Sequence, residues 1–289
     1  MKISEALDSS YKLLNTKSKT YKLDSEVLLA DVLKKKNRLD LYLNLNQSLN
    51  KKEKSLFFKY IDERKSTKPV SKILNKSHFW SFELDISKKV LIPRPETEVL
   101  VDLVTKRIEK KSRIKFLDVG CGSGCLSFAL LDFYKNSSGI AIDISKQAVL
   151  NTKINFEKKF STKRLKIIRQ DLFTFKTQNF FDLIISNPPY LKLSEYSQLD
   201  KSIKQYEPKD ALVADNKSGL KFFENIILKL KNNLKLNGYL ALEIGDFQFK
   251  KIGKMLELNG FKIEDTFVLI NNQVRCLVAK KVKNLALQS

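Results

Sequence analysis

Residues 114–126 read Ile-Lys-Phe-Leu-Asp-Val-Gly-Cys-Gly-Ser-Gly-Cys-Leu, and this stretch decides the fold class. Its apolar beginning predicts a buried strand, and the alternating glycines that follow let the backbone turn tightly before a helix begins. A second apolar run ends at Asp143, nineteen residues after Gly124. Strand, glycine loop, helix and strand in this order predict one unit of a doubly wound, largely parallel sheet.

The glycine loop and Asp143 together predict a nucleoside site. An acidic side chain about 20 positions after such a loop suits the two hydroxyls of a ribose. The loop has the spacing GxGxG and carries no basic residue that could meet a pyrophosphate, which favours S-adenosylmethionine over NAD. The loop residues expected to bind this cofactor are Gly120, Cys121, Gly122, Ser123 and Gly124.

Residues 181–190 predict a second functional loop, because they read Phe-Asp-Leu-Ile-Ile-Ser-Asn-Pro-Pro-Tyr. Two consecutive prolines cannot continue a strand, so the chain must open into a rigid loop at Asn187. In open α/β sheets ligands bind at the carboxyl ends of the strands. The side chain of Asn187 has one acceptor oxygen and two N–H donors, which suits it to bind a planar amino group through hydrogen bonds. Its expected partners in catalysis are Pro188, Pro189 and Tyr190.

These two loops in one chain resemble those of the S-adenosylmethionine-dependent amino-methyltransferases. Further stretches resemble the release factor glutamine methyltransferases (the HemK/PrmC family): Phe79-Trp80-Ser81, residues 91–101, residues 206–208 and Ala211-Leu212. Residues 24–33 resemble the N-terminal helical domain of that family, so the similarity extends from about residue 3 to 280.

The resemblance implies a fold and a division into domains. We expect the class I methyltransferase fold, a Rossmann-like, seven-stranded doubly wound α/β sheet whose last strand is antiparallel, with a small N-terminal helical domain. Residues 1–68 would form a helical domain that recognises the substrate, residues 69–92 a hairpin linker, and residues 93–289 the catalytic domain.

The resemblance also implies the reaction. The enzyme would transfer a methyl group from S-adenosyl-L-methionine to the side-chain amide of the glutamine in the Gly-Gly-Gln motif of class 1 peptide chain release factors, its protein partners in translation termination. The side-chain oxygen of Asn187 and the backbone carbonyl of Pro188 would accept the two amide hydrogens and aim the nitrogen at the methyl group.

Other residues receive roles from the same resemblance. Asp143 would hold the ribose, Asp171 the adenine amino group, and Leu172 the adenine ring, at a position where the family often has an aromatic residue. Asn187 would also touch the cofactor. The remaining residues expected at the substrate pocket are Arg94 and Glu207, together with Tyr190.

The rest of the sequence alternates between strand and helix patterns. Strands are expected at 114–119, 139–143, 165–169, 181–186, 238–244, 261–269 and 274–280. Helices are expected at 96–110, 124–134, 145–158, 218–235 and 246–258. Residues 79–86 predict one arm of a hairpin and 88–93 the other, with Asn75 in the turn before the first arm. The helical N-terminal region includes Asp24 as a predicted helix N-cap.

Composition limits the classes of protein. The chain has 289 residues, of which 43% are hydrophobic, enough for one large domain and a small one. Three cysteines and one histidine argue against a disulfide framework and a metal site. No run of 18 apolar residues and no signal-peptide core is present, so we expect a cytoplasmic protein with no membrane partner.

The net charge of +22 has two interpretations. It could attract a nucleic acid or a ribonucleoprotein. The lysines are spread along the whole chain, however, which favours a compositional bias of the kind produced by AT-rich genomes. Direct binding of nucleic acid is therefore not required, and we expect a monomer.

Three other functions remain open at this point. The glutamine could belong to a ribosomal protein of the large subunit. Asn-Pro-Pro-Tyr is also shared by DNA adenine and RNA guanine methyltransferases, although no target-recognition domain is evident here. A basic RNA- or ribosome-binding protein could have kept a methyltransferase fold without activity, against which the intact glycines, Asp143 and Asn187 argue.

Overall fold

The computed structural model describes residues 1–215 and 217–283. Position 216 and the last six residues of the predicted catalytic domain, 284–289, lie outside the described residues. The chain divides into two compact units, the first comprising Met1–Lys76 with Asp200–Tyr206 and the second Ser77–Leu199 with Glu207–Ser289.

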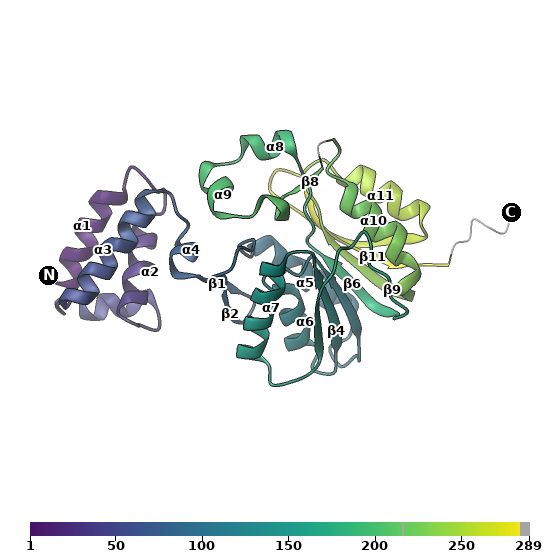
Figure 1. Cartoon of the computed structure of the whole chain (residues 1–289), viewed down its shortest axis with the longest axis horizontal. Coiled ribbons are helices and arrows are strands. Elements are labelled where there is room, and N and C mark those ends of the chain that lie inside the picture. Colours follow the sequence, from purple (N-terminus) through teal and green to yellow (C-terminus); the bar gives the residue numbers. More distant parts are fainter. Residues whose placement is uncertain (216, 284–289) are drawn as a thin grey trace. The chain divides into compact units, whose positions relative to one another are not determined.

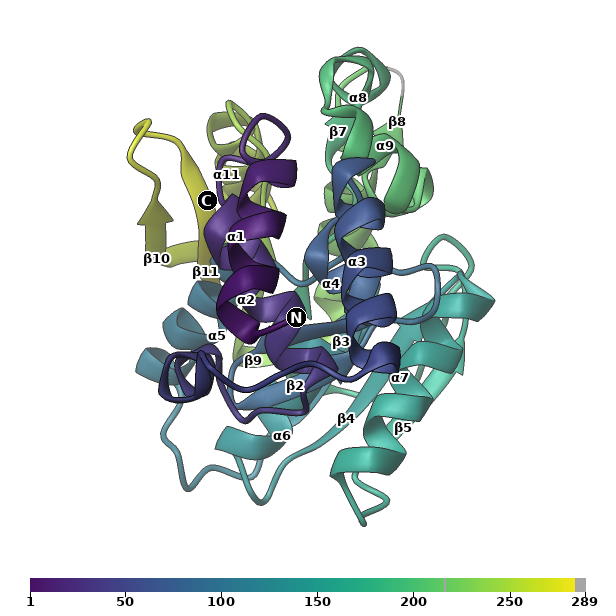
Figure 2. The same cartoon turned by 90° about the vertical axis from the view of Figure 1, so that its left-hand side faces the viewer.

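The first unit is helical, as its apolar spacing predicts. Three helices pack side by side around one core (Figures 1 and 2), to which Ile3, Leu28 and Phe57 each contribute a fully buried side chain. Its elements are α1 (Ile3–Leu14), α2 (Tyr21–Val32), the 3₁₀ helix η1 (Arg38–Asn44), α3 (Lys51–Lys65), the short α4 (Val70–Leu74) and α9 (Lys201–Tyr206).

The predicted N-cap in this unit is wrong, because helix α2 begins three residues before Asp24 and Thr20 is its N-cap. The Asp24 carboxylate is buried and accepts hydrogen bonds from the Ser18 hydroxyl (2.6 Å) and from Arg64 Nε (2.7 Å). A buried carboxylate needs such partners, so Asp24 links helices α2 and α3 instead of capping one of them.

The second unit is built on a seven-stranded sheet with the strand order β10-β11-β9-β6-β3-β4-β5, which Figure 2 shows from β10 at one edge to β5 at the other. Its strands are β3 (Lys115–Val119), β4 (Ser138–Asp143), β5 (Leu165–Arg169), β6 (Phe181–Ser186), β9 (Leu234–Glu243), β10 (Phe261–Val268) and β11 (Val274–Lys281). In this sheet β11 runs antiparallel to both of its neighbours, β10 and β9, and the other neighbouring strands pair in parallel. The seven strands and the antiparallel last strand are confirmed.

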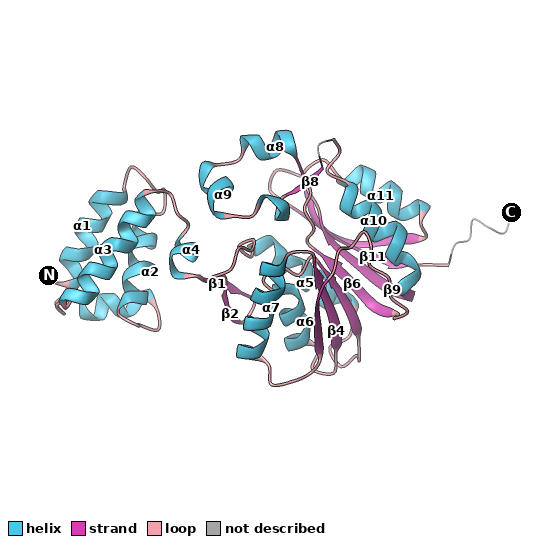
Figure 3. Cartoon of the chain, viewed as in Figure 1, coloured by secondary structure: helices cyan, strands magenta, loops and turns pink. Residues whose placement is uncertain are grey.

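Helices cover both faces of this sheet (Figures 1 and 3). One face packs against α5 (Pro95–Arg107), α6 (Cys125–Phe133) and α7 (Lys146–Lys159), the other against α10 (Lys221–Leu230) and α11 (Phe249–Leu258). Strand β6 shows the division, since Leu183 and Ile185 enter the first core and Ile184 enters the second. Successive side chains of a strand point to opposite faces, so a strand apolar throughout is what this layered fold requires.

The largest differences from the expected boundaries lie at the end of helix α10 and the start of strand β9, while α5 ends three residues early and α11 begins three residues late. The helix predicted at 218–235 is only Lys221–Leu230, with a 3₁₀ turn after it, and strand β9 already begins at Leu234. The Asp215 carboxylate accepts the backbone N–H groups of Lys217 (2.7 Å) and Gly219 (3.0 Å) and holds these residues in a loop before helix α10. After the turn, Leu234 pairs with Phe181 of β6 and starts the strand early.

The hairpin prediction is also wrong. The two paired strands are β1 (Lys76–Phe79) and β2 (Phe82–Asp85), and the chain turns at Trp80. Trp80 has a left-handed φ of 56°, and its N–H donates to Glu98 Oε1 at 3.0 Å, which fixes the turn there. Asn75 is left-handed as predicted, but it caps helix α4.

Residues 88–93 form no strand. They lie instead against helix α7, where Val90 and Ile92 are buried with Ala148. Across the described ranges, the structure has no helix long and apolar enough to cross a membrane.

Candidate active site

The glycine loop joins β3 to α6. The loop glycines adopt left-handed φ values, with Gly120 at 74°, Gly122 at 57° and Gly124 at 87°. At Gly124 a side chain would also collide with the Phe128 ring, since a Cβ there would lie 2.4 Å from it. At Gly120 a Cβ would meet nothing within 4 Å. Gly124 therefore serves close packing, whereas the backbone at Gly120 faces open space.

Asp143, at the end of β4, anchors this loop. Its carboxylate accepts the backbone N–H of Gly122 (3.0 Å) and of Ser145 (2.8 Å). Burial raises the pKa of Asp143, and these two hydrogen bonds oppose the shift. Each oxygen keeps one further lone pair, so the carboxylate can also accept hydroxyl groups.

A cavity of about 650 Å³ opens beside these groups, at the carboxyl ends of the parallel strands. This volume is typical of sites for small molecules and cofactors. The predicted site residues that line it are Arg94, Gly120, Cys121, Gly122, Ser123, Asp143, Asp171, Leu172, Asn187, Pro188 and Pro189. Three predicted residues, Gly124, Tyr190 and Glu207, are not among its lining residues.

The cavity also has two aromatic residues that the sequence does not predict. Phe173 and Phe222 both line it, and their ring centroids lie 5.3 Å apart. Phe173 directly follows Asp171 and Leu172, the two residues expected at the adenine. Phe222 lies in helix α10, far from them in the sequence. The cavity thus has an aromatic wall although Leu172 is aliphatic.

Asn187 is oriented by a residue from another element. Its side-chain nitrogen donates to Thr97 Oγ1 at 3.1 Å, and the Thr97 hydroxyl donates to Glu243 Oε2 at 2.6 Å. Thr97 lies in the first turn of α5 and Glu243 at the end of β9, and both are buried. The sequence predicts no contact of either residue with Asn187. One signal for Glu243 was its place at a strand end, since the carboxyl ends of parallel strands share one edge of the sheet.

Tyr190 is held behind the cavity wall. Its carbonyl accepts from Gln248 Nε2 at 2.9 Å, and its hydroxyl lies 3.5 Å from Glu243 Oε1. The guanidinium of Arg275 lies over its ring, 5.5 Å from the centroid, a cation–π arrangement. Burial raises the pKa of Tyr190, so its hydroxyl stays protonated.

Arg94 and Glu207 form an ion pair. Glu207 is buried and accepts from Arg94 (2.6 Å) and from the backbone N–H of Ile92 (3.2 Å). Arg94 is partly exposed and lines the cavity. Glu207 therefore fixes Arg94 at the cavity wall and does not reach the cavity itself.

The cysteines of the glycine loop are thiols. Burial raises the pKa of Cys125 to about 12 and that of Cys121 well above its usual value. The thiolate is the reactive form, so neither acts as a nucleophile near neutral pH. In the part of the chain that is described, no group of three or more histidine, cysteine or acidic side chains could hold a metal ion.

Comparisons with known proteins agree with this architecture. Residues 5–74 match the PrmC N-terminal domain and residues 95–206 match the Methyltransferase small domain. The release factor glutamine methyltransferase of Clostridium acetobutylicum is 36% identical over 264 residues, covering 90% of this chain and 92% of the relative. The chain belongs to the release factor glutamine methyltransferase family.

Other members of the family support this membership. The release factor glutamine methyltransferase of Clostridium botulinum is 37% identical, covering 84% of this chain and 86% of the relative. The fold is shared more widely, since a methyltransferase from Pyrococcus furiosus superposes with a TM-score of 0.51 at 19% identity, covering 69% and 90% of the two chains. The resemblance, the fold class and the assignment as a methyltransferase are confirmed.

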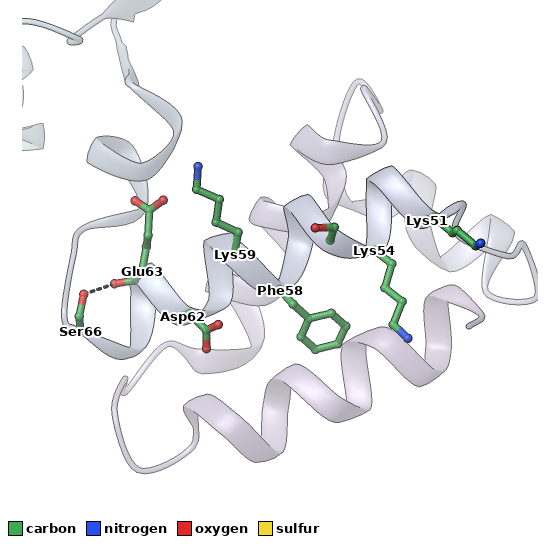
Figure 4. Close-up of a pocket in the computed structure, with 8 residues that line it drawn as sticks. Lys51, Lys54, Phe58, Lys59, Asp62, Glu63 and Ser66 are labelled. Atoms are coloured by element: carbon green, nitrogen blue, oxygen red, sulfur yellow. Dashed lines mark hydrogen bonds between the residues drawn. The ribbon is translucent and has the colours of Figure 1, made fainter.

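The helical unit of this methyltransferase has a hollow of its own, of about 850 Å³ along helix α3. Figure 4 shows that its charged side chains do not converge, since Lys54 and Lys59 point to opposite sides of the helix. The residues that line it are Lys51, Lys54, Ser55, Phe58, Lys59, Asp62, Glu63 and Ser66. It contains none of the predicted site residues, so the cavity of the second unit is the candidate active site.

Proposed function

We propose that this protein methylates the side-chain amide nitrogen of the glutamine in the Gly-Gly-Gln motif of class 1 peptide chain release factors, with S-adenosyl-L-methionine as the methyl donor. The observation that carries the proposal is Asn187, which lines the cavity and whose nitrogen is occupied by Thr97. Its oxygen is left to accept an incoming N–H. Membership of the family supports the choice of substrate.

The residues of the cavity fit the cofactor. The backbone at Gly120 borders open space that any side chain would fill, and Asp143 keeps acceptor capacity for a ribose. Asp118 does not itself line the cavity but directly precedes the lining residue Val119 in β3; it is fully buried, and its Oδ1 has no hydrogen-bond partner in the described part of the chain. Such an atom needs a donor, and an ammonium group of a bound amino acid moiety would supply one.

We assign the other cofactor contacts on the same grounds. Asp171 would accept from the adenine amino group, while Leu172 and the aromatic pair Phe173 and Phe222 would pack against the ring. Gly122, Cys121 and Ser123 would contact the cofactor through the loop backbone. Asn187 would touch both the cofactor and the substrate.

S-adenosylmethionine, when bound, supplies a methyl group on a positively charged sulfur. An amide nitrogen is a weak nucleophile, because its lone pair is delocalised into the carbonyl. Asn187 Oδ1 and the Pro188 carbonyl would accept its two hydrogens and hold the lone pair toward the methyl group. The rigid Pro188-Pro189 backbone fixes both acceptors before the reaction, and such preorganisation lowers the barrier.

The remaining predicted residues would act around this centre. Tyr190 would stiffen the loop through its contacts with Gln248 and Arg275. Arg94, held by Glu207, would meet the substrate backbone at the cavity. The helical domain, residues 1–68, would recognise the release factor, and the hairpin linker, 69–92, would join it to the catalytic domain, 93–289. We expect the protein to act as a monomer in the cytoplasm, where translation takes place.

The proposal is tested by methyl transfer from labelled S-adenosylmethionine to a purified class 1 release factor. A release factor whose Gly-Gly-Gln glutamine is changed to alanine serves as the matched control. We expect label on the first protein and none on the second. Label on neither, with cofactor binding intact, would refute the proposal, and the ribosomal-protein substrate would then be assayed next.

A further inference from the structure

An asparagine can hold a substrate amide only in one of its two orientations. The side-chain oxygen and nitrogen have nearly the same shape, but one accepts hydrogen bonds and the other donates them. If Asn187 presented its nitrogen to the cavity, it would face the amino group of a glutamine with a second donor. Some other group must therefore fix the orientation of Asn187.

Thr97 can impose this orientation because its hydroxyl has only one hydrogen. An ionised carboxylate accepts hydrogen bonds and cannot donate them, so the Thr97 hydrogen goes to Glu243 Oε2, 2.6 Å away. The Thr97 oxygen then only accepts, and Asn187 must turn its nitrogen toward it, at 3.1 Å. The oxygen of Asn187 is thereby directed away from Thr97.

The charge of Glu243 controls the direction of this chain of hydrogen bonds. A protonated Glu243 would donate to Thr97, and Thr97 would be free to donate in turn. Asn187 would then be stabilised in the reversed orientation, with its oxygen on Thr97. The active site would lose its acceptor without any change in the backbone.

The surroundings of Glu243 favour its protonated form more than water does. Burial raises its pKa, while Thr97 and Arg275 oppose the shift. The titratable or charged groups that face it come from α5, α6, the Asn-Pro-Pro-Tyr loop and β11, and they are Glu96, Cys125, Tyr190, Arg275 and Cys276. Only Arg275 among them is a cation.

We propose that Thr97 and Glu243 are positioning residues that hold the Asn187 amide with its oxygen toward the substrate, and that protonation of Glu243 reverses this orientation. This inference rests on the proposed function of Asn187 as the acceptor. Under this inference, the two buried residues fix the direction of the hydrogen bonds to Asn187, a role that neither packing nor cofactor binding requires.

Steady-state kinetics with three variants test the inference. Thr97→Val keeps the shape but removes the acceptor, and it should lower kcat by about ten- to a hundredfold with an unchanged dissociation constant for S-adenosylmethionine. Thr97→Ser should restore most of this loss. Thr105→Val is the matched control, because Thr105 lies on the same helix and its hydroxyl donates to the backbone carbonyl of Asp102, one turn earlier, at 2.8 Å. The kcat of Thr105→Val should be that of the wild type.

Glu243→Gln tests the pH dependence. The wild type should lose kcat as the pH falls through the pKa of Glu243, whereas the variant, which cannot ionise, should have a lower kcat without this acidic limb. Wild-type kcat in Thr97→Val, or an unchanged acidic limb in Glu243→Gln, would overturn the inference.

A spectroscopic readout separates this inference from the choice of substrate. The side-chain NH₂ resonance of Asn187, assigned by its loss in Asn187→Ala, should shift as Glu243 titrates and should lose this response in Thr97→Val. The experiment needs no release factor. A resonance that ignores both changes would refute the positioning role, whether or not the release factor is methylated.

Discussion

At the scale of single residues, Gly124 shows how the glycine loop depends on packing. It has a φ of 87°, and an added Cβ would lie 2.4 Å from the Phe128 ring and 2.9 Å from Thr152. Gly124→Ala should lower the free energy of unfolding by about 2–4 kcal/mol, since left-handed backbone strain and overpacking add.

Gly253 provides the control for this prediction. It lies in helix α11, where a Cβ would meet only Ile263 at 3.6 Å. Gly253→Ala should raise the free energy of unfolding by about 0.5–1 kcal/mol, the usual gain of alanine over glycine in a helix. Denaturant unfolding of both variants measures the difference, and equal stabilities would contradict the packing argument.

Asp118 predicts a dependence of stability on pH. Burial raises its pKa to about 7, against the hydrogen bond from Ser127, and the coulombic effect of Asp143 adds to the rise. The native state therefore holds a proton that the unfolded state releases from about pH 4 upward, so this group's contribution to stability falls as the pH rises from 4 to 7. The slope is limited to one proton, about 1.4 kcal/mol per pH unit.

The measurement is unfolding of the cofactor-free protein between pH 4.5 and 7.5, alongside Asp118→Asn. The variant cannot titrate at this position, so it should gain stability relative to the wild type as the pH rises. Parallel curves for the two proteins would show that Asp118 titrates normally and would contradict this account.

At the scale of elements, Gln248 joins three loops near the carboxyl ends of strands β6 and β9. Its oxygen accepts the N–H of Gly245 at 2.9 Å, and its nitrogen donates to the carbonyls of Tyr190 (2.9 Å) and Gly219 (3.4 Å). Gln248 is almost fully buried. The catalytic loop is therefore held from behind by one amide side chain.

Gln248→Met keeps the volume but removes these hydrogen bonds. It should cost about 2 kcal/mol or more of stability, because buried backbone groups lose their partners, and it should lower kcat because the loop is less well fixed. The exposed Gln198 of α8 (Leu193–Gln198) is the control, and Gln198→Met should change neither quantity. Wild-type kcat and stability in Gln248→Met would show that the loop is rigid without this side chain.

The elements also show what sequence could predict. The glycine loop and the end of β6 were predicted because their signals are local, namely glycines after an apolar strand and prolines that end one. The hairpin turn was misplaced, because Trp80 is held left-handed by Glu98, a residue 18 positions away. A tertiary hydrogen bond of this kind leaves no local signal for the turn.

At the scale of the whole molecule, the residues that orient the active site also make tertiary contacts that leave no local signal in the sequence. Thr97 meets Asn187 across 90 positions and Glu243 across 146. These contacts form only in the folded chain, where α5 packs on the part of the sheet in which β9, β6 and β3 lie side by side. The sequence therefore predicts the fold and the residues on the two loops, but the residues that orient them need the packed structure.

The division into two units leads to a prediction for a shortened chain. Every residue that lines the cofactor cavity lies between 89 and 222, and none of them belongs to the first unit. A chain beginning at Ser77 should bind S-adenosylmethionine as tightly as the full chain, but it should methylate the release factor poorly if the helical unit recognises that substrate.

Calorimetry and the methyl-transfer assay on the same preparation check this prediction, and circular dichroism confirms that the shortened chain is folded. A folded chain with full methylation activity would contradict the recognition role of the helical unit. A folded chain that has lost cofactor binding would contradict the placement of the site in the second unit alone.

The central claim is that Asn187 presents a glutamine amide nitrogen to the methyl donor, and tandem mass spectrometry of the reacted release factor tests it most directly. With the wild-type enzyme, we expect one added methyl group on the side-chain nitrogen of the Gly-Gly-Gln glutamine. Asn187→Ala should leave the release factor unmodified while binding S-adenosylmethionine nearly as well as the wild type. A methyl group on another atom, or the same product from Asn187→Ala, would contradict the account.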